Sequence, residues 1–367
     1  MARELGVSVP TVFAAFSAAL LVSAMFGPYA GRAIDRWGGR PVLMATNAVF
    51  AVGLFALSAA NGPVGLFLAW LVLGIGMGSG LYEAAFAALV RLYGERSRAS
   101  ITGITLIAGF ASTVGWPLSA VLEAQFGWRG ACITWAALHL LLGMPLNALL
   151  PKVARKKLPV EPEPTKHEDA VAGESHHSRR AAILLTFVFA ATWFISTAMA
   201  AHMPLLLQAG GASVTAAVAA SALIGPAQVA GRMLEYGLLR KLHPIFSARA
   251  AALMHPIGAT VFAVAGAPAA AVFTVLHGAG NGVMTIASGT LPLVLFGPHG
   301  YGARQGVLMV PARIAQAFAP WLFALCLASW GIGALMLSGF LGLAAFAALL
   351  LLPRALARSE TFGRSGV

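Results

Sequence analysis

Long apolar stretches, separated by short breaks that carry proline, glycine or charge, dominate the sequence from end to end. A helix needs about 20 residues to cross the roughly 30 Å hydrocarbon core of a bilayer, and stretches of that size occur eleven times. We expect spans near residues 10–30, 41–60, 64–92, 101–122, 131–150, 181–207, 214–234, 248–265, 268–296, 307–330 and 331–352. The pattern predicts an all-α, polytopic membrane protein with about 11 transmembrane helices.

Composition supports this fold class and excludes others. Of the 367 residues, 59% are hydrophobic and 10% are charged, whereas soluble domains carry about 25% charged residues. A water-exposed globule of this composition would lack the polar residues to cover its surface, which excludes soluble enzymes and nucleic-acid-binding proteins. Cys132 and Cys326 lie in apolar runs, and no metal, hydrolase or redox motif occurs, so we expect no enzyme activity, metal or cofactor.

The basic residues indicate how the chain is oriented. When the 24 Lys and Arg are assigned to alternating sides of the spans, all but Arg3, Arg129 and Arg313 fall on one side. The positive-inside rule makes that side cytoplasmic. The formal charge of +12 therefore describes membrane topology, and we expect a multi-pass protein of the bacterial inner membrane with a cytoplasmic C-terminus.

The parity of the spans raises a question about the N-terminus. Eleven crossings that end in the cytoplasm must start outside, yet residues 1–4 resemble neither a signal peptide nor an outward anchor. We expect that a first helix is missing from this sequence. The alternative is a genuine eleven-span protein with an external N-terminus.

A short motif occurs twice in the chain, about 200 residues apart. Residues 27–35 read Gly-Pro-Tyr-Ala-Gly-Arg-Ala-Ile-Asp, and residues 225–235 repeat the Gly-Pro pair and then Gly-Arg-Met-Leu-Glu at the same end of a span. Two copies six spans apart predict a duplicated helical unit. We expect an N-terminal bundle of five spans at 1–150, a cytoplasmic linker at 151–180, a C-terminal bundle of six spans at 181–353 and a cytoplasmic tail at 354–367.

The first copy also carries a family likeness. Residues 31–40, Gly-Arg-Ala-Ile-Asp-Arg-Trp-Gly-Gly-Arg, resemble the G-x-x-x-D-R-x-G-R-R signature that follows the second helix of major facilitator superfamily transporters, with Gly39 as the main departure. The likeness extends over the whole chain, from family helix 2 to helix 12, and is similar to bacterial members near the monocarboxylate-porter-like branch. It implies two helical bundles that alternate access to a central site, and we expect proton coupling on the same ground.

The motif residues are candidates for a conformational gate. A carboxylate at Asp35 can cap the positive N-terminal end of a neighbouring helix. The resemblance implies that this helix begins near Gln305–Val307 in the other bundle and that Glu235 forms a weaker latch in the second half. The alternative is that these are only topology-determining surface charges. We assign the gate to Gly31, Asp35, Arg36, Arg40, Arg232 and Glu235.

Two charges lie well inside predicted spans. Glu83 is eight residues from Arg91, and Arg313 is nine residues from Arg304, which places both roughly 12–13 Å below the cytoplasmic surface. A charge at that depth is costly unless it faces protein or water. We expect the two to form or exchange an ion pair across the cavity, with Arg313 attracting an anionic group and Glu83 carrying a proton. The alternatives are a snorkelling arginine and a static structural pair.

Other polar and aromatic residues fall on spans that line the pathway in the resembling family. A lone histidine in a membrane helix is more often a hydrogen-bonded structural residue, and we expect that role for His139 and His255. The remaining substrate and coupling candidates are Tyr82, Trp193, His202, His277, Asn281 and Gln316.

Glycines recur at four-residue spacing in two spans, at Gly74/Gly78 and Gly278/Gly282. Because neither run follows a strand, we interpret them as surfaces for close helix packing and not as nucleotide-binding loops.

These observations favour a secondary active transporter that moves a small organic anion, working as a monomer with protons and the bilayer as its other partners. Drug or toxicant efflux is the second hypothesis, although Trp70 stands where many drug/proton antiporters of the family carry an arginine. A non-transporting membrane sensor and an inactive truncated product are the remaining alternatives.

Overall fold

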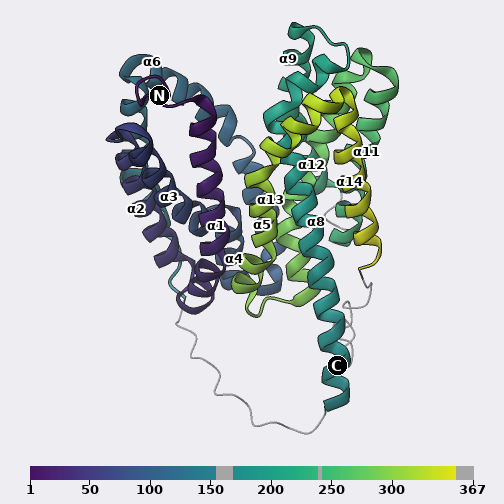
Figure 1. The fold of residues 1–367 in the computed structure, drawn as a ribbon. Coiled ribbons are helices and arrows are strands. Elements are labelled where there is room, and N and C mark those ends of the chain that lie inside the picture. The colour runs from purple at the N-terminus through teal and green to yellow at the C-terminus, as the bar shows by residue number, and fades with distance from the viewer. Residues whose placement is uncertain (154–167, 239–241, 353–367) are drawn as a thin grey trace.

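The computed structural model describes residues 1–153, 168–238 and 242–352, which form helices and no strand (Figure 1). This confirms the all-α prediction. The helices of the N-terminal half are α1 (Val9–Trp37), α2 (Gly39–Ser58), α3 (Gly62–Gly80), α4 (Tyr82–Tyr93), α5 (Arg98–Ala108), α6 (Ala111–Leu138) and α7 (Met144–Ala148). Those of the C-terminal half are α8 (Glu168–Ala209), α9 (Val214–Ala222), α10 (Ile224–Gly237), α11 (Pro244–Ala265), α12 (Ala270–Phe296), α13 (Tyr301–Trp330) and α14 (Ala334–Leu350).

The described residues contain nine stretches that are long and apolar enough to cross a membrane. Two of them, Gly62–Ala108 with 47 residues and Tyr301–Leu350 with 50 residues, are long enough for two crossings each. Both contain a short 3₁₀ turn, at Gly94–Ser97 and Gly331–Gly333, where the helix direction changes. The second stretch divides there into α13 and α14. In the first, α5 has only 11 residues and forms a crossing together with the part of α6 before Gly127. Counted in this way, the described residues hold the eleven crossings that the sequence predicts.

Element boundaries differ from the predicted ones where the backbone has a special conformation. The predicted span 64–92 is broken at Leu81, whose extended backbone separates α3 from α4. Gly127, with φ of +68°, is a non-helical residue inside α6, so α6 contains the end of one predicted span and the start of the next. Residues 168–180 were predicted as part of the linker but begin α8. The rest of the linker beyond residue 153, and the predicted tail, lie outside the described residues.

Two groups of helices stand beside each other, α1 to α7 and α8 to α14 (Figure 1). They converge where α1 ends and α13 begins, and their ribbons diverge toward the opposite end. We name the end that carries Arg36, Arg98 and Arg304 the basic end. An apolar cluster joins the two groups there, with Phe86 and Ile101 from one group packed with Leu293 and Tyr301 from the other.

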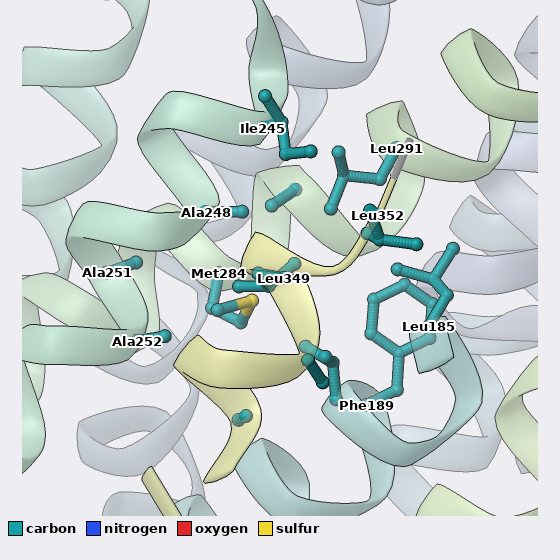
Figure 2. Packing of buried hydrophobic residues seen from close by; sticks show 14 of the residues in the cluster. Leu185, Phe189, Ile245, Ala248, Ala251, Ala252, Met284, Leu291, Leu349 and Leu352 are labelled. Atoms are coloured by element: carbon teal, nitrogen blue, oxygen red, sulfur yellow. The ribbon is translucent and has the colours of Figure 1, made fainter. Parts of the chain in front are cut away.

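The C-terminal group has its own apolar core. Figure 2 shows side chains from α8, α11, α12 and α14 meeting in one cluster, including the fully buried Leu185, Phe189, Leu291 and Leu349. Lipid tails are as apolar as leucine, so close-fitting contacts rather than removal of apolar surface from water hold such helices together. Stable packing of this group fixes the position of the helices that carry the candidate site.

Glycine contacts repeat between the halves and match the interpretation of the four-residue spacing. A Cβ on Gly78 of α3 would lie 2.8 Å from the carbonyl oxygen of Ser23 on α1. A Cβ on Gly282 of α12 would overlap the carbonyl oxygen of Gln228 on α10. Equivalent helix pairs in the two halves therefore approach through glycine, as expected for a duplicated unit.

Candidate substrate site and gate

Glu83 owes its position to the helix break at Leu81. The backbone there is extended, so α4 starts anew at Tyr82 and places Glu83 in its first turn. Unpaired N–H groups and the helix dipole make this end of a helix positive, which stabilises a carboxylate. A discontinuous helix in the interior of a membrane bundle thus supplies a favourable place for the only acid in the span.

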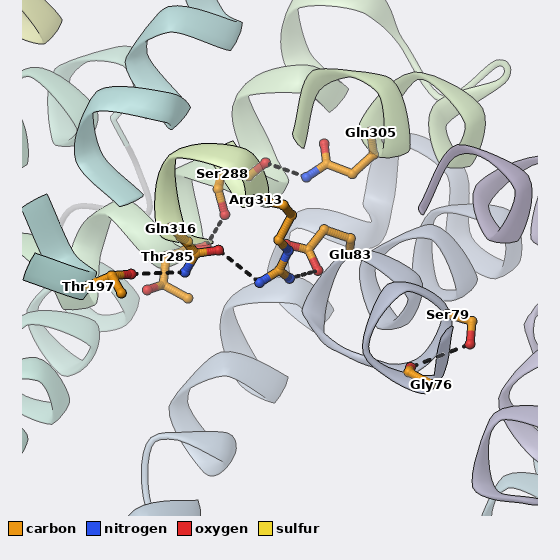
Figure 3. Close-up of polar contacts among 9 residues, drawn as sticks. All are labelled: Gly76, Ser79, Glu83, Thr197, Thr285, Ser288, Gln305, Arg313 and Gln316. Carbon is orange, nitrogen blue, oxygen red and sulfur yellow. Dashed lines mark hydrogen bonds and ion pairs between the residues drawn. The ribbon is translucent and has the colours of Figure 1, made fainter. Parts of the chain in front are cut away.

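Arg313 on α13 binds this carboxylate across the boundary between the two groups of helices (Figure 3). Its Nη2 donates to Glu83 Oε2 at 2.8 Å, and the two side chains are 11% and 16% exposed. Its Nη1 donates to Oε1 of Gln316 at 3.0 Å, and the Gln316 amide donates to Thr197 of α8 at 3.3 Å. The ion pair predicted between Glu83 and Arg313 is present, and its part in transport remains a prediction.

A small cavity of about 20 Å³ is lined by both members of the pair and by other residues of α1, α3 and α13. Ser23 lines it, and its hydroxyl is buried without a hydrogen-bond partner. A cavity of this size has room for about one water molecule.

The other predicted substrate residues are dispersed. Tyr82 stacks on Phe86, with ring centroids 5.5 Å apart, and lies next to the Arg232 guanidinium of the other group. His202 Nε2 donates to the carbonyl oxygen of Pro320 at 2.8 Å, and Trp193 packs against the apolar core. Tyr82 and Gln316 thus lie near the pair, whereas His202 and Trp193 have structural contacts.

His277 and Asn281 face a second cavity, of about 30 Å³, inside the C-terminal group. His277 Nδ1 lies 3.0 Å from Nδ1 of His255 on α11, so one of these atoms donates and the other accepts. His255 Nε2 is buried without a partner. Sequence reasoning placed His277 in the pathway and His255 in a supporting role, but the structure joins the two histidines in one polar pair.

Asp35 makes the contact predicted for the gate. Its Oδ1 accepts from the backbone N–H of Gly302 at 3.0 Å, and its Oδ2 accepts from that of Ala303 at 2.8 Å. Gly300, with φ of +57°, turns the chain just before α13 so that these N–H groups lie at a free helix end. The partner helix was predicted correctly, although it begins at Tyr301 and not near Gln305–Val307.

Gly31 allows this close approach. A Cβ on Gly31 would overlap the carbonyl oxygen of Gly302, and a Cβ on Gly306 would lie 2.6 Å from the carbonyl oxygen of Gly27. The backbones of α1 and α13 are therefore in contact along one helical turn. Only glycine fits at these positions without separating the helices.

The second copy of the motif makes a different contact. Glu235 is 2% exposed, and its Oε1 lies 3.7 Å from Nη2 of Arg98 at the start of α5. Arg98 also donates to the carbonyl oxygen of Leu242 at 2.8 Å, and Arg232 donates to that of Thr105 near the end of α5 at 3.2 Å. A cation is favoured at this negative helix end. The two groups are thus joined at both copies of the motif.

Arg36 and Arg40 lie away from the contact between α1 and α13. Arg36 is exposed, with its guanidinium 5.7 Å from the ring of Trp37, and Arg40 is in the first turn of α2. Their assignment to the gate remains a prediction, and among the described residues no contact between the two groups supports it.

Sequence reasoning missed several polar residues that make hydrogen bonds near this interface. The Gln305 amide donates to the carbonyl oxygen of Ser288 at 3.1 Å (Figure 3), and the Tyr301 hydroxyl donates to that of Gly289 at 2.7 Å. Thr197 and Arg98 were missed as well. Each is a single polar residue with no motif around it, and its partner is known only once the helices are packed.

The fold is thus that of a two-bundle membrane protein, with two repeated helical groups that meet around a buried ion pair. The family model described as Major Facilitator Superfamily matches residues 1–273. The chain belongs to that superfamily and is a multi-pass membrane protein.

Individual proteins match only part of this chain. Human monocarboxylate transporter 11 is 30% identical over 238 residues, which is 63% of this chain and 50% of that protein. Multidrug resistance protein MdtL of Klebsiella pneumoniae is 28% identical over 148 residues, 39% of this chain and 37% of that protein. Fission yeast (Schizosaccharomyces pombe) multidrug resistance protein fnx1 is 31% identical over 116 residues, 31% of this chain and 22% of that protein. The chain thus spans half or less of the length of these relatives.

A solved structure shows the same fold. The human organic anion transporter MFSD10 superposes with a TM-score of 0.63, covering 92% of this chain and 83% of that one at 15% identity. At this level of identity the likeness concerns the fold alone.

Proposed function

We propose that this protein is a proton-coupled secondary active transporter that moves a small organic anion by alternating access, and that it has no enzymatic activity. In this proposal the basic end faces the cytoplasm of a bacterium. The observation that carries the proposal is the buried contact between Arg313 and Glu83, which come from opposite helical groups.

The pair can couple an anion to a proton through charge alone. While Glu83 is ionised, it neutralises Arg313 and leaves no net charge to attract an anion. When Glu83 takes up a proton, the guanidinium becomes an uncompensated buried cation, which is costly until an anion arrives. Proton and anion therefore favour each other's binding, and thermodynamic linkage makes this effect reciprocal. The loaded site carries no additional charge, which eases its passage through the closed state.

The names of the relatives fit either of two solute classes. Monocarboxylate transporters 11 and 3 among them favour a small carboxylate, which a guanidinium binds through two parallel hydrogen bonds. The multidrug resistance proteins MdtL and fnx1 keep drug efflux as the second candidate. Arg313 at the centre of the site favours the carboxylate, because a cationic drug would meet a like charge once Glu83 is protonated and no longer neutralises Arg313.

The test is uptake of radiolabelled lactate and pyruvate into proteoliposomes with an imposed proton gradient. We expect the gradient to accelerate uptake by the unmodified protein. Arg313→Gln should reduce uptake by about 10- to 100-fold, because a charged hydrogen bond contributes about 1.5–3 kcal/mol. Glu83→Gln should permit uptake that no longer responds to the gradient. Arg96→Gln, which alters an exposed arginine away from the site, should behave like the unmodified protein.

Normal proton dependence in both site variants would contradict the proposal. Movement of ethidium in place of either carboxylate would establish the efflux alternative. Failure of any solute to move, with folded protein in the vesicles, would favour the sensor or inactive alternative.

A further inference from the structure

A groove of about 450 Å³ lies on the N-terminal group between α1 and α2, with Ser79 of α3 among its lining residues. It is separate from the contact with the other group, because α1 meets α13 through Gly27 and Gly31. The groove begins near the basic end and extends toward the middle of the helices. It therefore opens to the surroundings of the bundle and not to the central site.

The groove has a cationic end and an apolar end. Arg32 and Arg36 line it near the C-terminus of α1, whereas Phe26 of α1 and Val49 of α2 line its deeper part. Arg32 and Phe26 are six residues apart, which corresponds to about 9 Å along the helix. The change from charged to apolar lining over this distance matches the change from headgroup to acyl chain in a bilayer leaflet.

Aromatic residues mark the level of the interface. Tyr29 is 65% exposed and Trp37 is 48% exposed, and both line the groove. Tyrosine and tryptophan gather where the hydrocarbon meets the headgroups. The Arg32 guanidinium lies 4.7 Å from the Tyr29 ring centroid, a stacked contact that leaves the in-plane N–H groups for other partners.

The charge of the groove is positive. None of its lining residues is acidic. Asp35 lies between the two arginines in the sequence, but its carboxylate oxygens accept hydrogen bonds from the α13 backbone. A phosphate would therefore find two guanidinium groups, and the ammonium of a zwitterionic headgroup would find no carboxylate among the lining residues.

We propose that this groove binds an anionic phospholipid from the leaflet at the basic end. The lipid phosphate binds Arg32 and Arg36, and one acyl chain lies along Phe26 and Val49. Basic pockets between transmembrane helices on the cytoplasmic side suit anionic headgroups. The site is independent of the solute and of the coupling mechanism proposed above.

The experiment is native mass spectrometry of the purified full chain in detergent, titrated separately with phosphatidylglycerol, phosphatidylethanolamine and phosphatidylcholine. We expect one phosphatidylglycerol to be retained at concentrations where the other two are not. Arg32→Gln and Arg36→Gln should each weaken that binding about fivefold, the effect of one arginine near an anionic lipid. Arg96→Gln removes an exposed arginine outside the groove and should leave it unchanged.

Ala45→Trp offers a second variant, because Ala45 lines the groove and a tryptophan there would fill part of it. It should reduce lipid retention while both arginines remain. Equal retention of the three lipids, or equal loss in Arg96→Gln and Arg32→Gln, would overturn the proposal. Displacement of the lipid by millimolar inorganic phosphate would likewise overturn it, since the site would then recognise phosphate without a lipid chain.

Discussion

His243 has two constraints at the start of α11. Its Nδ1 accepts a hydrogen bond from the backbone N–H of Ile245 at 3.3 Å, which caps the helix. Burial, and then the nearby positive charges of Arg98 and Arg249, lower the pKa of His243 from its ordinary value. Protonation would remove the accepting lone pair and add a third positive charge to the group. The folded state therefore favours the neutral form of His243.

The pH dependence follows from the direction of this shift. A folded-state pKa below the unfolded value of about 6.5 contributes stability above that pH, and the contribution is lost as the pH falls through the folded-state pKa. We expect acidification from about pH 7.5 to pH 5.5 to lower the thermal midpoint of the unmodified protein more than that of His243→Asn. Asparagine can cap the helix without titrating. The same decrease in both proteins would exclude His243 as the cause.

At the scale of single residues, charge inside an apolar span was the informative signal. Glu83 and Arg313 were predicted as a pair because each is costly alone, and their contact confirms that reasoning. The pairing of His255 with His277 could not be predicted, because a histidine in a span has no intrinsic partner. Which residue lies opposite a given histidine depends on how the two helices are rotated about their axes. Short polar residues in a span do not determine that rotation.

At the scale of helices, the crossing of α1 and α13 depends on glycine. We expect Gly31→Ala to lower the free energy of unfolding by about 1–3 kcal/mol, the cost of inserting a methyl group into a packed contact. The added Cβ would overlap the Gly302 carbonyl, and the backbone there cannot move aside without separating the helices. The measurement is the thermal midpoint in detergent.

Gly225→Ala on α10 is the matched control, because a Cβ there meets no atom within 4 Å. It should be neutral or slightly stabilising, since alanine favours helix over glycine. Equal destabilisation by the two substitutions would show that the loss comes from helix flexibility and not from the contact.

Helix number was predictable and helix boundaries were not. Span length follows from bilayer thickness, and the nine apolar stretches of the described residues, two of them of double length, agree with the eleven spans that the sequence predicts. The break at Leu81 has no proline, and the glycines before it and Glu83 after it indicated close packing and a buried charge but not the end of a helix. Its cause lies in the packing of α3 and α4 against different neighbours, which hydropathy does not record.

At the scale of the molecule, the two groups touch from the basic end to a point past the middle of α1. The hydroxyl of Ser17 donates to the carbonyl oxygen of Ala317 on α13 at 3.0 Å. Alternating access requires such contacts to separate during each cycle. We expect oxidation of Ser17→Cys/Ala317→Cys, in a chain with Cys132 and Cys326 replaced by alanine, to stop transport in proteoliposomes.

Reduction of that disulfide should restore transport, and Ser17→Cys alone should transport before and after oxidation. Undiminished transport by the oxidised double variant would mean that α1 and α13 stay together throughout the cycle.

The duplicated motif predicted two related halves. At the basic end, however, the two copies of the motif make different contacts. Asp35 reaches backbone groups of α13, whereas Glu235 reaches a side chain, that of Arg98. A repeat in sequence fixes which residues are equivalent but not the distance between helices. The closer approach of α1 to α13 depends on glycines in both helices, and α5 has no such pair.

This difference between the two contacts affects which substitutions each can tolerate. Every amino acid except proline offers the N–H groups that Asp35 uses, so the first contact survives replacement of Ala303 by other residues. The second contact needs both a carboxylate and a guanidinium. Loss of one leaves the other charge without a compensating partner. In related sequences we expect Asp35 to be kept whatever residue stands at position 303. Arg98 and Glu235 should be either both kept or both replaced.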